Sequence, residues 1–289
     1  IRDAVAAGEV SAAEVARDMN CVIYCARSAP MSEGDDIDSI RLPDRQEDEM
    51  LELAKSNRNL VVVLQCGTAV DMSRWIDSAR AVLVIWYGGQ MVGTALGDIL
   101  SGRENPSGKL PFILGRGVDD YPCERLGLWP ARLILDKPPE TPGFSPDERV
   151  VIHGYDADYE EGAFIGYRWF EKQNITPLFP FGFGLSYTTF ELSDSRVEFS
   201  DDGVSVTCRV TNTGTRAGSE VVQLYVAPPG AARDSRRPGK ELKGFAKIHV
   251  GPGETRAVTI HVPHDDLAVY DAAADEVSPM PEEYSILLG

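Results

Sequence analysis

Leu60-Val61-Val62-Val63-Leu64 is a continuous apolar run, with no polar residue to face solvent on either side of a strand. A strand of this kind is typical of a parallel sheet, in which helices cover both faces. Similar strand-like runs occupy 21–25 and 81–85, and segments with helical spacing alternate with the strands along the chain. This order predicts an open α/β sandwich, which is a mostly parallel sheet with helices on both faces.

Hydrophobic spacing predicts further elements around these strands. They are helices at 3–18 and 44–57, a helix after the turn at Gly88-Gly89, and a strand at 110–114. Asp44 followed by Glu47 is a start signal for the second helix. In the third helix, Gly93 and Gly97 would allow close packing on the sheet.

An acidic segment lies between the run at 21–25 and the helix at 44–57. It crowds its carboxylates within six residues: Glu33, Asp35, Asp36 and Asp38. Carboxylates this close repel one another, so a loop that holds them together keeps one of them protonated or binds a cationic or substrate partner. Such crowding suits acid–base catalysis. A solvated acidic loop is the alternative in a chain of this acidity.

Three loops are expected to meet at the carboxyl ends of the parallel strands. They are the acidic loop at 32–38, Cys66-Gly67-Thr68 and Trp86-Tyr87-Gly88-Gly89. Ligands of open α/β sheets bind at this edge. Trp86 and Tyr87 could therefore form the wall of a sugar site, and plain packing is the alternative.

The periodicity of the sequence changes to two beyond Phe190. Apolar residues at 204, 206, 208 and 210 alternate with polar ones, and turn signals separate this strand from others of the same kind. Short alternating strands between turns predict a β-sandwich of about 100 residues. No catalytic constellation is recognisable in it.

The chain is therefore expected to divide into an α/β sandwich over 1–178, an aromatic linker over 179–190 and a β-sandwich over 191–289. Within the first part, the Pro-rich and charged stretch at 116–161 is expected to form a long excursion with little regular structure. The phenylalanines of the linker alternate, as in an extended segment pinned against a domain surface.

The composition argues against several classes of partner. The formal net charge is −17, from 45 acidic and 28 basic residues, which opposes binding to nucleic acid and to anionic membranes. No apolar run approaches the roughly 18 residues of a membrane span. The five cysteines lack zinc or redox spacing and are expected to be buried free thiols, and the four histidines are scattered. Neither a metal nor a cofactor is expected.

The N-terminus, Ile1-Arg2-Asp3, has neither an initiator methionine nor the layout of a signal peptide. The sequence is therefore expected to begin within a longer protein, and it leaves the cellular compartment open.

Taken together, these segments closely resemble the C-terminal half of glycoside hydrolase family 3. The order and spacing of several motifs carry the resemblance. They are Ser32-Glu33-Gly34 with Leu42-Pro43, 61–72, Gly89-Gln90, 105–111, 161–168, 179–187, Asn212-Thr213-Gly214 and 240–245.

The resemblance implies an α/β sandwich followed by a fibronectin type III-like domain, normally preceded by a TIM-like barrel. In that family the barrel supplies a nucleophilic aspartate, and the α/β sandwich supplies the general acid/base. Matched residue by residue, the acid/base is Glu33, and Asp36 falls on the aspartate of the same loop. The charged nucleophile, together with Asp35 and Asp36, would raise the pKa of Glu33. The implied reaction is retaining, exo-acting hydrolysis of terminal β-D-glucosyl residues from a glucoside or oligosaccharide, without a cofactor.

Two departures from the family pattern occur close to the expected site. Ile37 stands where an arginine often follows the loop aspartate, and Met91 stands where a glutamate is common after Gly89-Gln90. Nothing in the chain matches the barrel, so the chain alone is expected to be inactive and to need the barrel as its partner. The alternatives are a non-catalytic sugar-binding or structural module and a β-xylosidase.

Overall fold

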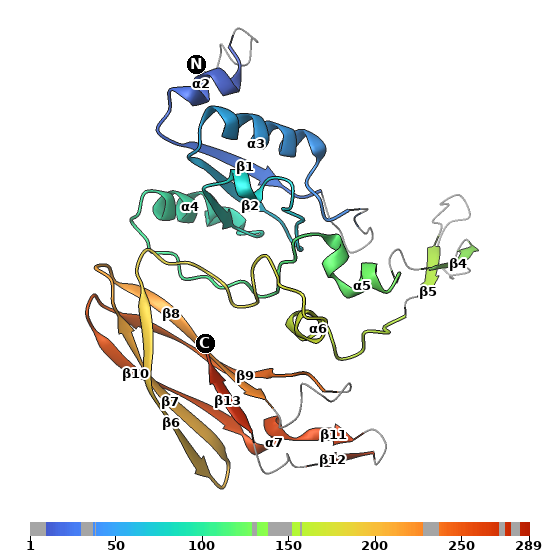
Figure 1. Cartoon of the computed structure of the whole chain (residues 1–289), viewed down its shortest axis with the longest axis vertical. Coiled ribbons are helices and arrows are strands. Elements are labelled where there is room, and N and C mark those ends of the chain that lie inside the picture. Colours follow the sequence, from blue (N-terminus) through green and yellow to red (C-terminus); the bar gives the residue numbers. More distant parts are fainter. Residues whose placement is uncertain are drawn as a thin grey trace.

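The computed structural model describes residues 10–29, 37, 39–128, 132–137, 152–156, 158–227, 237–271, 275–278 and 284–289. Glu33 and Asp36 of the acidic segment, and the beginning of the helix expected at 3–18, lie outside these ranges. Figure 1 shows the two parts of the chain one above the other along its longest axis, with the N-terminal α/β part at the top.

A three-stranded parallel sheet forms the centre of the N-terminal part. Its strands are β1 (Val22–Arg27), β2 (Leu60–Gln65) and β3 (Ala81–Val84), in the order β1-β2-β3. The apolar run that predicts this sheet lies in its middle strand, where Val62 and Leu64 are fully buried. The expected parallel α/β arrangement is confirmed.

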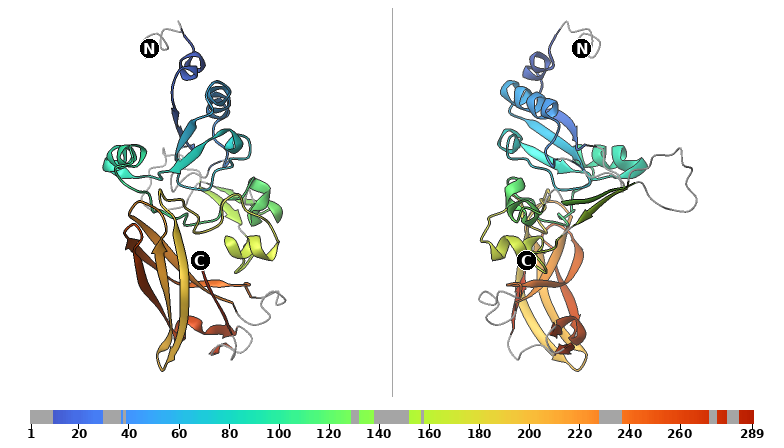
Figure 2. Two further views of the ribbon diagram at one scale, coloured as in Figure 1. Left: turned by 60° about the vertical axis from the view of Figure 1, so that its left-hand side comes forward. Right: turned by 90° about the vertical axis from the view of Figure 1, so that its right-hand side faces the viewer.

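Helices flank this sheet. They are α2 (Ala12–Arg17), α3 (Asp44–Ser56) and α4 (Val92–Leu100). Figure 2 shows α3 and α4 on opposite sides of the sheet. The side chain of Ser11 accepts a hydrogen bond from the backbone N–H of Glu14, and the Glu14 side chain accepts one from Ser11 in return. This capping box fixes the first residue of α2.

Several local expectations were wrong. The helix α3 begins at Asp44 as expected, but its N-cap is Pro43, and the side chain of Glu47 forms ion pairs instead of capping the helix. Gly93 and Gly97 make no close approach, because a Cβ at either would meet nothing within 4 Å. The segment 110–114 does not join the sheet as a strand: it pairs with the aromatic linker, through an isolated antiparallel bridge between Leu114 and Phe179 and a bond from the N–H of Leu110 to Phe183.

Shorter elements connect and follow the sheet. They are the 3-10 helices η1 (Ile76–Ser78), η2 (Gly89–Met91) and η3 (Val118–Asp120), the helices α5 (Pro122–Arg125) and α6 (Tyr167–Lys172), and the antiparallel pair β4 (Arg132–Lys137) and β5 (Ile152–Asp156). The stretch at 116–161 therefore holds more regular structure than its proline content suggests. The run Leu133-Ile134-Leu135 is apolar enough to form a strand and pairs across the stretch.

The C-terminal part consists chiefly of two antiparallel sheets, with orders β10-β7-β6 and β13-β8-β9. Their strands are β6 (Phe190–Ser200), β7 (Gly203–Asn212), β8 (Gly218–Ala227), β9 (Glu241–Val250), β10 (Thr255–Pro263) and β13 (Ser285–Leu288). The helix α7 (His264–Leu267) and the pair β11 (Val269–Asp271) and β12 (Glu276–Ser278) complete it. Val210, Val222 and Leu224 lie fully buried in the core, and the alternation along β7 has the predicted inward face.

The aromatic linker is held against the α/β part. The N–H of Leu110 donates to the carbonyl of Phe183, and the N–H of Leu114 donates to that of Phe179. The side-chain oxygen of Asn105 accepts hydrogen bonds from the Ser186 hydroxyl and the Tyr187 N–H, at 2.9 and 2.8 Å. The linker is therefore pinned to a domain surface, as expected.

Polar contacts also join the two parts directly. The amide nitrogen of Asn105 donates to the carbonyl of Ala217 at 2.9 Å. Lys109 pairs with Glu220 at 2.7 Å, and both side chains are only about 20 % exposed. The guanidinium of Arg216 donates to the carbonyl of Gly102.

The five cysteines are all free. Cys66 and Cys208 are buried, whereas Cys21, Cys25 and Cys123 are exposed, so the expectation of buried thiols was wrong for three of them. Across the part of the chain that the structure describes, no helix is long and apolar enough to cross a membrane.

Candidate active site

The loops that follow the three parallel strands meet at one edge of the sheet, as the sequence predicts. The N–H of Ser28, just after β1, donates to the carbonyl of Gln65 at 3.0 Å. The N–H of Ile85, just after β3, donates to the carbonyl of Leu64 at 2.9 Å. In the loop after β2, the N–H of Asp71 donates to the carbonyl of Ile40, which lies beyond the acidic segment. The described residues on either side of the acidic segment, Ser28 and Ile40, therefore lie beside the end of β2 and the loop after it.

Tyr87 and Trp86 occupy different environments at this edge. Tyr87 is 60 % exposed, and its ring lies so close over Gly67 that a Cβ at Gly67 would come within 2.5 Å of it. Trp86 is half-buried, and its ring meets the edge of Phe112 with the centroids 5.3 Å apart. Tyr87 therefore offers a ring face to the surface, while Trp86 also contributes to the core.

The backbone of Trp86 has a φ of 49°, in the left-handed region that bulky residues rarely adopt. Holding a non-glycine residue there costs on the order of 1–3 kcal/mol, and such strain clusters at functional sites. The surrounding packing, including the contact with Phe112, compensates for this cost.

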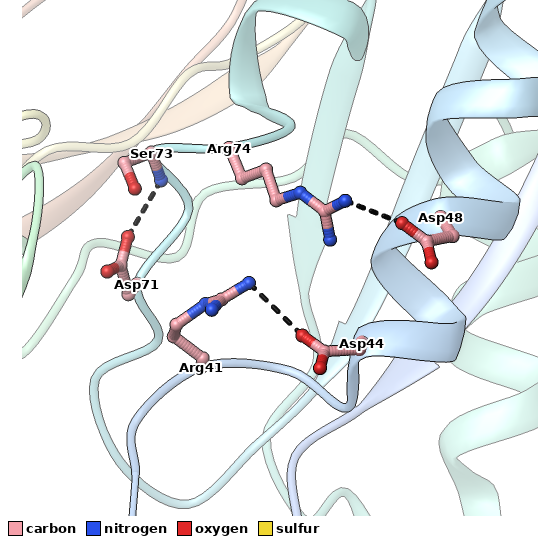
Figure 3. Close-up of a pocket in the computed structure, with 6 residues that line it drawn as sticks. All are labelled: Arg41, Asp44, Asp48, Asp71, Ser73 and Arg74. Atoms are coloured by element: carbon pink, nitrogen blue, oxygen red, sulfur yellow. Dashed lines mark hydrogen bonds and ion pairs between the residues drawn. The ribbon is translucent and has the colours of Figure 1, made fainter.

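An open hollow of about 590 Å³ lies at the start of α3, next to the loop after β2. Its lining is polar and mostly charged: Arg41, Asp44, Asp48, Asp71, Ser73 and Arg74 (Figure 3). These side chains come from the start of α3, from the residues just before it, and from the loop after β2. The acidic and basic groups pair with one another, so the hollow has no single sign of charge.

Glu47 is the centre of this charged cluster. Its side chain is fully buried, and its Oε2 accepts hydrogen bonds from Arg41 Nη2 at 2.5 Å and from Arg74 Nη1 at 3.2 Å. Arg74 also donates to Asp48 Oδ1 at 2.6 Å. The hydrogen bonds with Glu47 raise the pKa of both arginines. The cluster therefore keeps both guanidinium groups charged and in place.

Asp71 fixes the loop after β2 in the same cluster. Its side chain is 9 % exposed, and Oδ1 accepts a hydrogen bond from the N–H of Ser73 at 2.9 Å. Its backbone forms a parallel bridge with Arg41. The residue after the acidic segment and the loop after β2 are thus joined through backbone as well as side chains.

Sequence reasoning did not find the roles of Glu47 and Arg74. The signal for Glu47 was its position three and four residues before Met50 and Leu51, which places it on the buried stripe of the helix. A carboxylate on that stripe requires cationic partners. No comparable signal marks Arg74, because it lies in a loop whose course depends on the tertiary fold.

Among the described residues, no three His, Cys, Asp or Glu side chains are grouped in a way that could hold a metal ion. The two carboxylates proposed from the acidic segment, Glu33 and Asp36, lie outside the described ranges. The described part of the site therefore consists of the supports on either side of them, together with Trp86 and Tyr87.

The fold is that of a two-domain protein, with a parallel α/β domain followed by an antiparallel β-sandwich. Family models match both domains. The model of the "Glycosyl hydrolase family 3 C-terminal domain" matches residues 1–187, and that of the "Fibronectin type III-like domain" matches residues 220–289. The chain belongs to glycoside hydrolase family 3.

Particular relatives are β-glucosidases. The chain is 39 % identical to the "Beta-glucosidase" of Rhizobium radiobacter over 287 residues, which are 98 % of this chain and 32 % of that protein. It is also 39 % identical to the "Thermostable beta-glucosidase B" of Acetivibrio thermocellus, over 89 % of this chain and 31 % of that protein. The chain therefore spans about a third of the length of these relatives.

Solved structures of β-glucosidases share the fold. DesR from Streptomyces venezuelae, in complex with D-glucose, superposes with a TM-score of 0.81 at 33 % identity, over 99 % of this chain and 34 % of its own. The family 3 β-glucosidase of Bifidobacterium adolescentis superposes with a TM-score of 0.83 at 31 % identity, over 100 % of this chain and 39 % of its own.

Proposed function

We propose that the chain is the C-terminal part of a retaining, exo-acting β-glucosidase and that Glu33 is its general acid/base. The observation that carries the proposal is the match to β-glucosidases over nearly the whole chain, in both of its domains. The meeting of three loops at the carboxyl edge of the sheet supports it, because this edge is where ligands bind in such folds.

The chemistry needs two carboxyl groups about 5–5.5 Å apart across the glycosidic bond. One attacks the anomeric carbon, and the other protonates the departing oxygen. Glu33 is proposed as the second, and it then removes a proton from the water that releases the sugar. The first is proposed to come from a barrel domain outside this chain.

The proposed substrate is a β-glucoside or oligosaccharide with a terminal β-D-glucosyl residue. Asp36 would hydrogen-bond sugar hydroxyls, and the exposed ring of Tyr87 would form an apolar wall at the edge of the sheet. Trp86 would support this wall from below, since its side chain is anchored in the core beside Tyr87. The strained backbone of Trp86 fits a functional position.

The test uses a chimera in which this chain follows the portion of the Rhizobium radiobacter β-glucosidase that it does not match. Glu33→Ala should lower the hydrolysis of unactivated β-glucosides by on the order of 10²–10⁴. Substrates with good leaving groups should lose much less, because they need little protonation, and added azide should restore turnover. Glu52→Gln, which removes an exposed carboxylate from α3, is the control and should behave like the parent.

Two outcomes would contradict the proposal. Equal losses on both kinds of substrate would remove Glu33 from the acid role. Binding of glucose or a cello-oligosaccharide by an intact chimera that hydrolyses neither glucosides nor xylosides would support a non-catalytic sugar-binding module. A preference for xylosides would keep the mechanism and change the substrate to that of a β-xylosidase.

A further inference from the structure

The first turn of α3 contacts both ends of the acidic segment. On the side of β1, the Oε1 of Gln46 accepts a hydrogen bond from the N–H of Arg27 at 2.9 Å. The Nε2 of Gln46 donates to the carbonyl of the same residue at 3.0 Å. One amide side chain therefore pairs with both backbone groups of the last residue of β1, as a neighbouring strand would.

The next residue of the helix holds the other end. Glu47 is fully buried, and its Oε2 binds the guanidinium of Arg41 at 2.5 Å. Leu42, next to Arg41, is 2 % exposed in the core of the α/β part. The chain that returns from the acidic segment is thus fixed at consecutive residues, by an ion pair and by burial.

A second arginine completes the support. Arg74, from the loop after β2, binds the same Oε2 of Glu47 and also binds Asp48. The Oε1 of Glu47 is buried and has no hydrogen-bond partner among the described residues. Arg41 also pairs with Asp44, and Arg74 with Asp48, so loss of the charge of Glu47 would weaken the hold on both guanidinium groups at their shared buried partner.

We propose that Gln46 and Glu47 are positioning residues that fix the two ends of the segment 28–40 and so set the place of Glu33 at the edge of the sheet. This inference rests on the function proposed above. We call these two residues the clamp. Gln46 binds the backbone of Arg27 and Glu47 pairs with Arg41, so neither needs to touch the substrate.

The test compares Gln46→Ala and Glu47→Gln with the parent in the same chimera. Displacing a catalytic group by about 1 Å costs on the order of 100-fold in rate. Each variant should lose up to that factor in kcat on unactivated glucosides, with KM changed by less than about threefold. The loss should be much smaller on substrates with good leaving groups, because a displaced acid matters least for them. If the two residues had a purely structural role, the variants would contain less folded protein, and the activities on both kinds of substrate would fall by the same factor.

A matched control lies on the same turn of the helix. Arg45 faces solvent with an 88 % exposed side chain and pairs with Glu49 on the next turn of α3. Arg45→Ala should keep the parent ratio between the two substrates. Glu47→Asp, which retains the charge but shortens the side chain, should recover part of the activity lost in Glu47→Gln.

Amide hydrogen exchange on the chain itself separates this inference from the proposed function. Peptides covering 28–40 should exchange at least tenfold faster in Gln46→Ala and Glu47→Gln, and at the parent rate in Arg45→Ala. If exchange accelerates but Glu33→Ala shows no leaving-group dependence, the proposed function fails while the clamp stands. Two results would overturn the positioning role. One is an unchanged rate of exchange in Gln46→Ala and Glu47→Gln. The other is an unchanged ratio of rates on the two kinds of substrate in these variants, when Glu33→Ala does show the leaving-group dependence.

Discussion

Asn212→Ala should destabilise the C-terminal sandwich more than most single substitutions. Asn212 is fully buried at the end of β7. Its Nδ2 donates to the carbonyls of Arg216 and Val250, at 2.7 and 2.9 Å. Its Oδ1 accepts hydrogen bonds from the hydroxyl of Thr188 and the N–H of Gly214, at 2.7 and 3.0 Å. One side chain thus joins the linker, a turn and strand β9.

The expected loss follows from what each partner can do after truncation. The hydroxyl of Thr188 is buried but can rotate, and Gly214 and Arg216 are partly exposed, so each of these lost bonds costs about 1 kcal/mol. Val250 is fully buried, and its unpaired carbonyl costs about 1–3 kcal/mol. The sum is about 4–6 kcal/mol, which is a large part of the roughly 5–15 kcal/mol that stabilises a typical domain.

The assay must report on the sandwich rather than on the whole chain. All four tryptophans, at 75, 86, 129 and 169, precede the sandwich, so their fluorescence follows the α/β part. Amide hydrogen exchange of peptides from β7 and β8 reports on the sandwich. A loss of 4–6 kcal/mol should accelerate their slowest exchange by roughly a thousandfold or more, since about 1.4 kcal/mol corresponds to a factor of ten.

Two further variants make this prediction specific. Thr213→Ala changes the exposed neighbour and should cost less than about 0.5 kcal/mol. Asn212→Asp keeps the acceptor for Thr188 but sets a carboxylate against two carbonyls, so its stability should rise as the pH falls and the carboxylate is protonated. An Asn212→Ala protein within about 1 kcal/mol of the parent would refute the reasoning.

Two other predictions concern the α/β part. Burial raises the pKa of the Cys66 thiol to about 11, so the unfolded chain loses this proton at lower pH than the folded one. The free energy of unfolding should therefore fall by about 2 kcal/mol between pH 9 and 11. Urea titrations should show that this part of the pH dependence is missing in Cys66→Ala, and an equal pH dependence in the two proteins would contradict the prediction. Gly184→Ala should destabilise the junction, because its Cβ would lie 2.2 Å from the carbonyl oxygen of Gly108, whereas Gly108→Ala meets nothing within 4 Å and should change the melting temperature little. Equal melting temperatures for the two glycine variants would count against this packing.

The sequence predicts those features that depend on local pattern. The run at 60–64 indicates a strand that is buried on both sides, and the structure places it in the middle of the parallel sheet. The alternation along 204–210 likewise predicts the inward face of β7. In both cases the period of the hydrophobic residues matches the geometry of the element.

Features that depend on tertiary contacts were missed or predicted wrongly. The segment 110–114 is apolar enough for a strand, but its N–H groups bind the linker, which no local pattern shows. Glu47 resembled a helix start signal, and its role appears only when Arg41 and Arg74 converge on it. For the candidate site, the converging loops were predictable from topology, whereas the charged cluster that supports them was not.

The contacts between the two parts have a consequence for how such chains diverge. Lys109 and Glu220 form an ion pair that is largely removed from water, and Asn105 and Arg216 reach backbone carbonyls across the same junction. Without the C-terminal domain, Lys109 would lose its ion-pair partner and Asn105 would lose a hydrogen-bond acceptor. Hydrophobic repacking alone would not replace these polar interactions. Selection would therefore act on the two domains as one inherited unit. Moving either domain into a new protein would require matched changes in the residues on both sides of their interface.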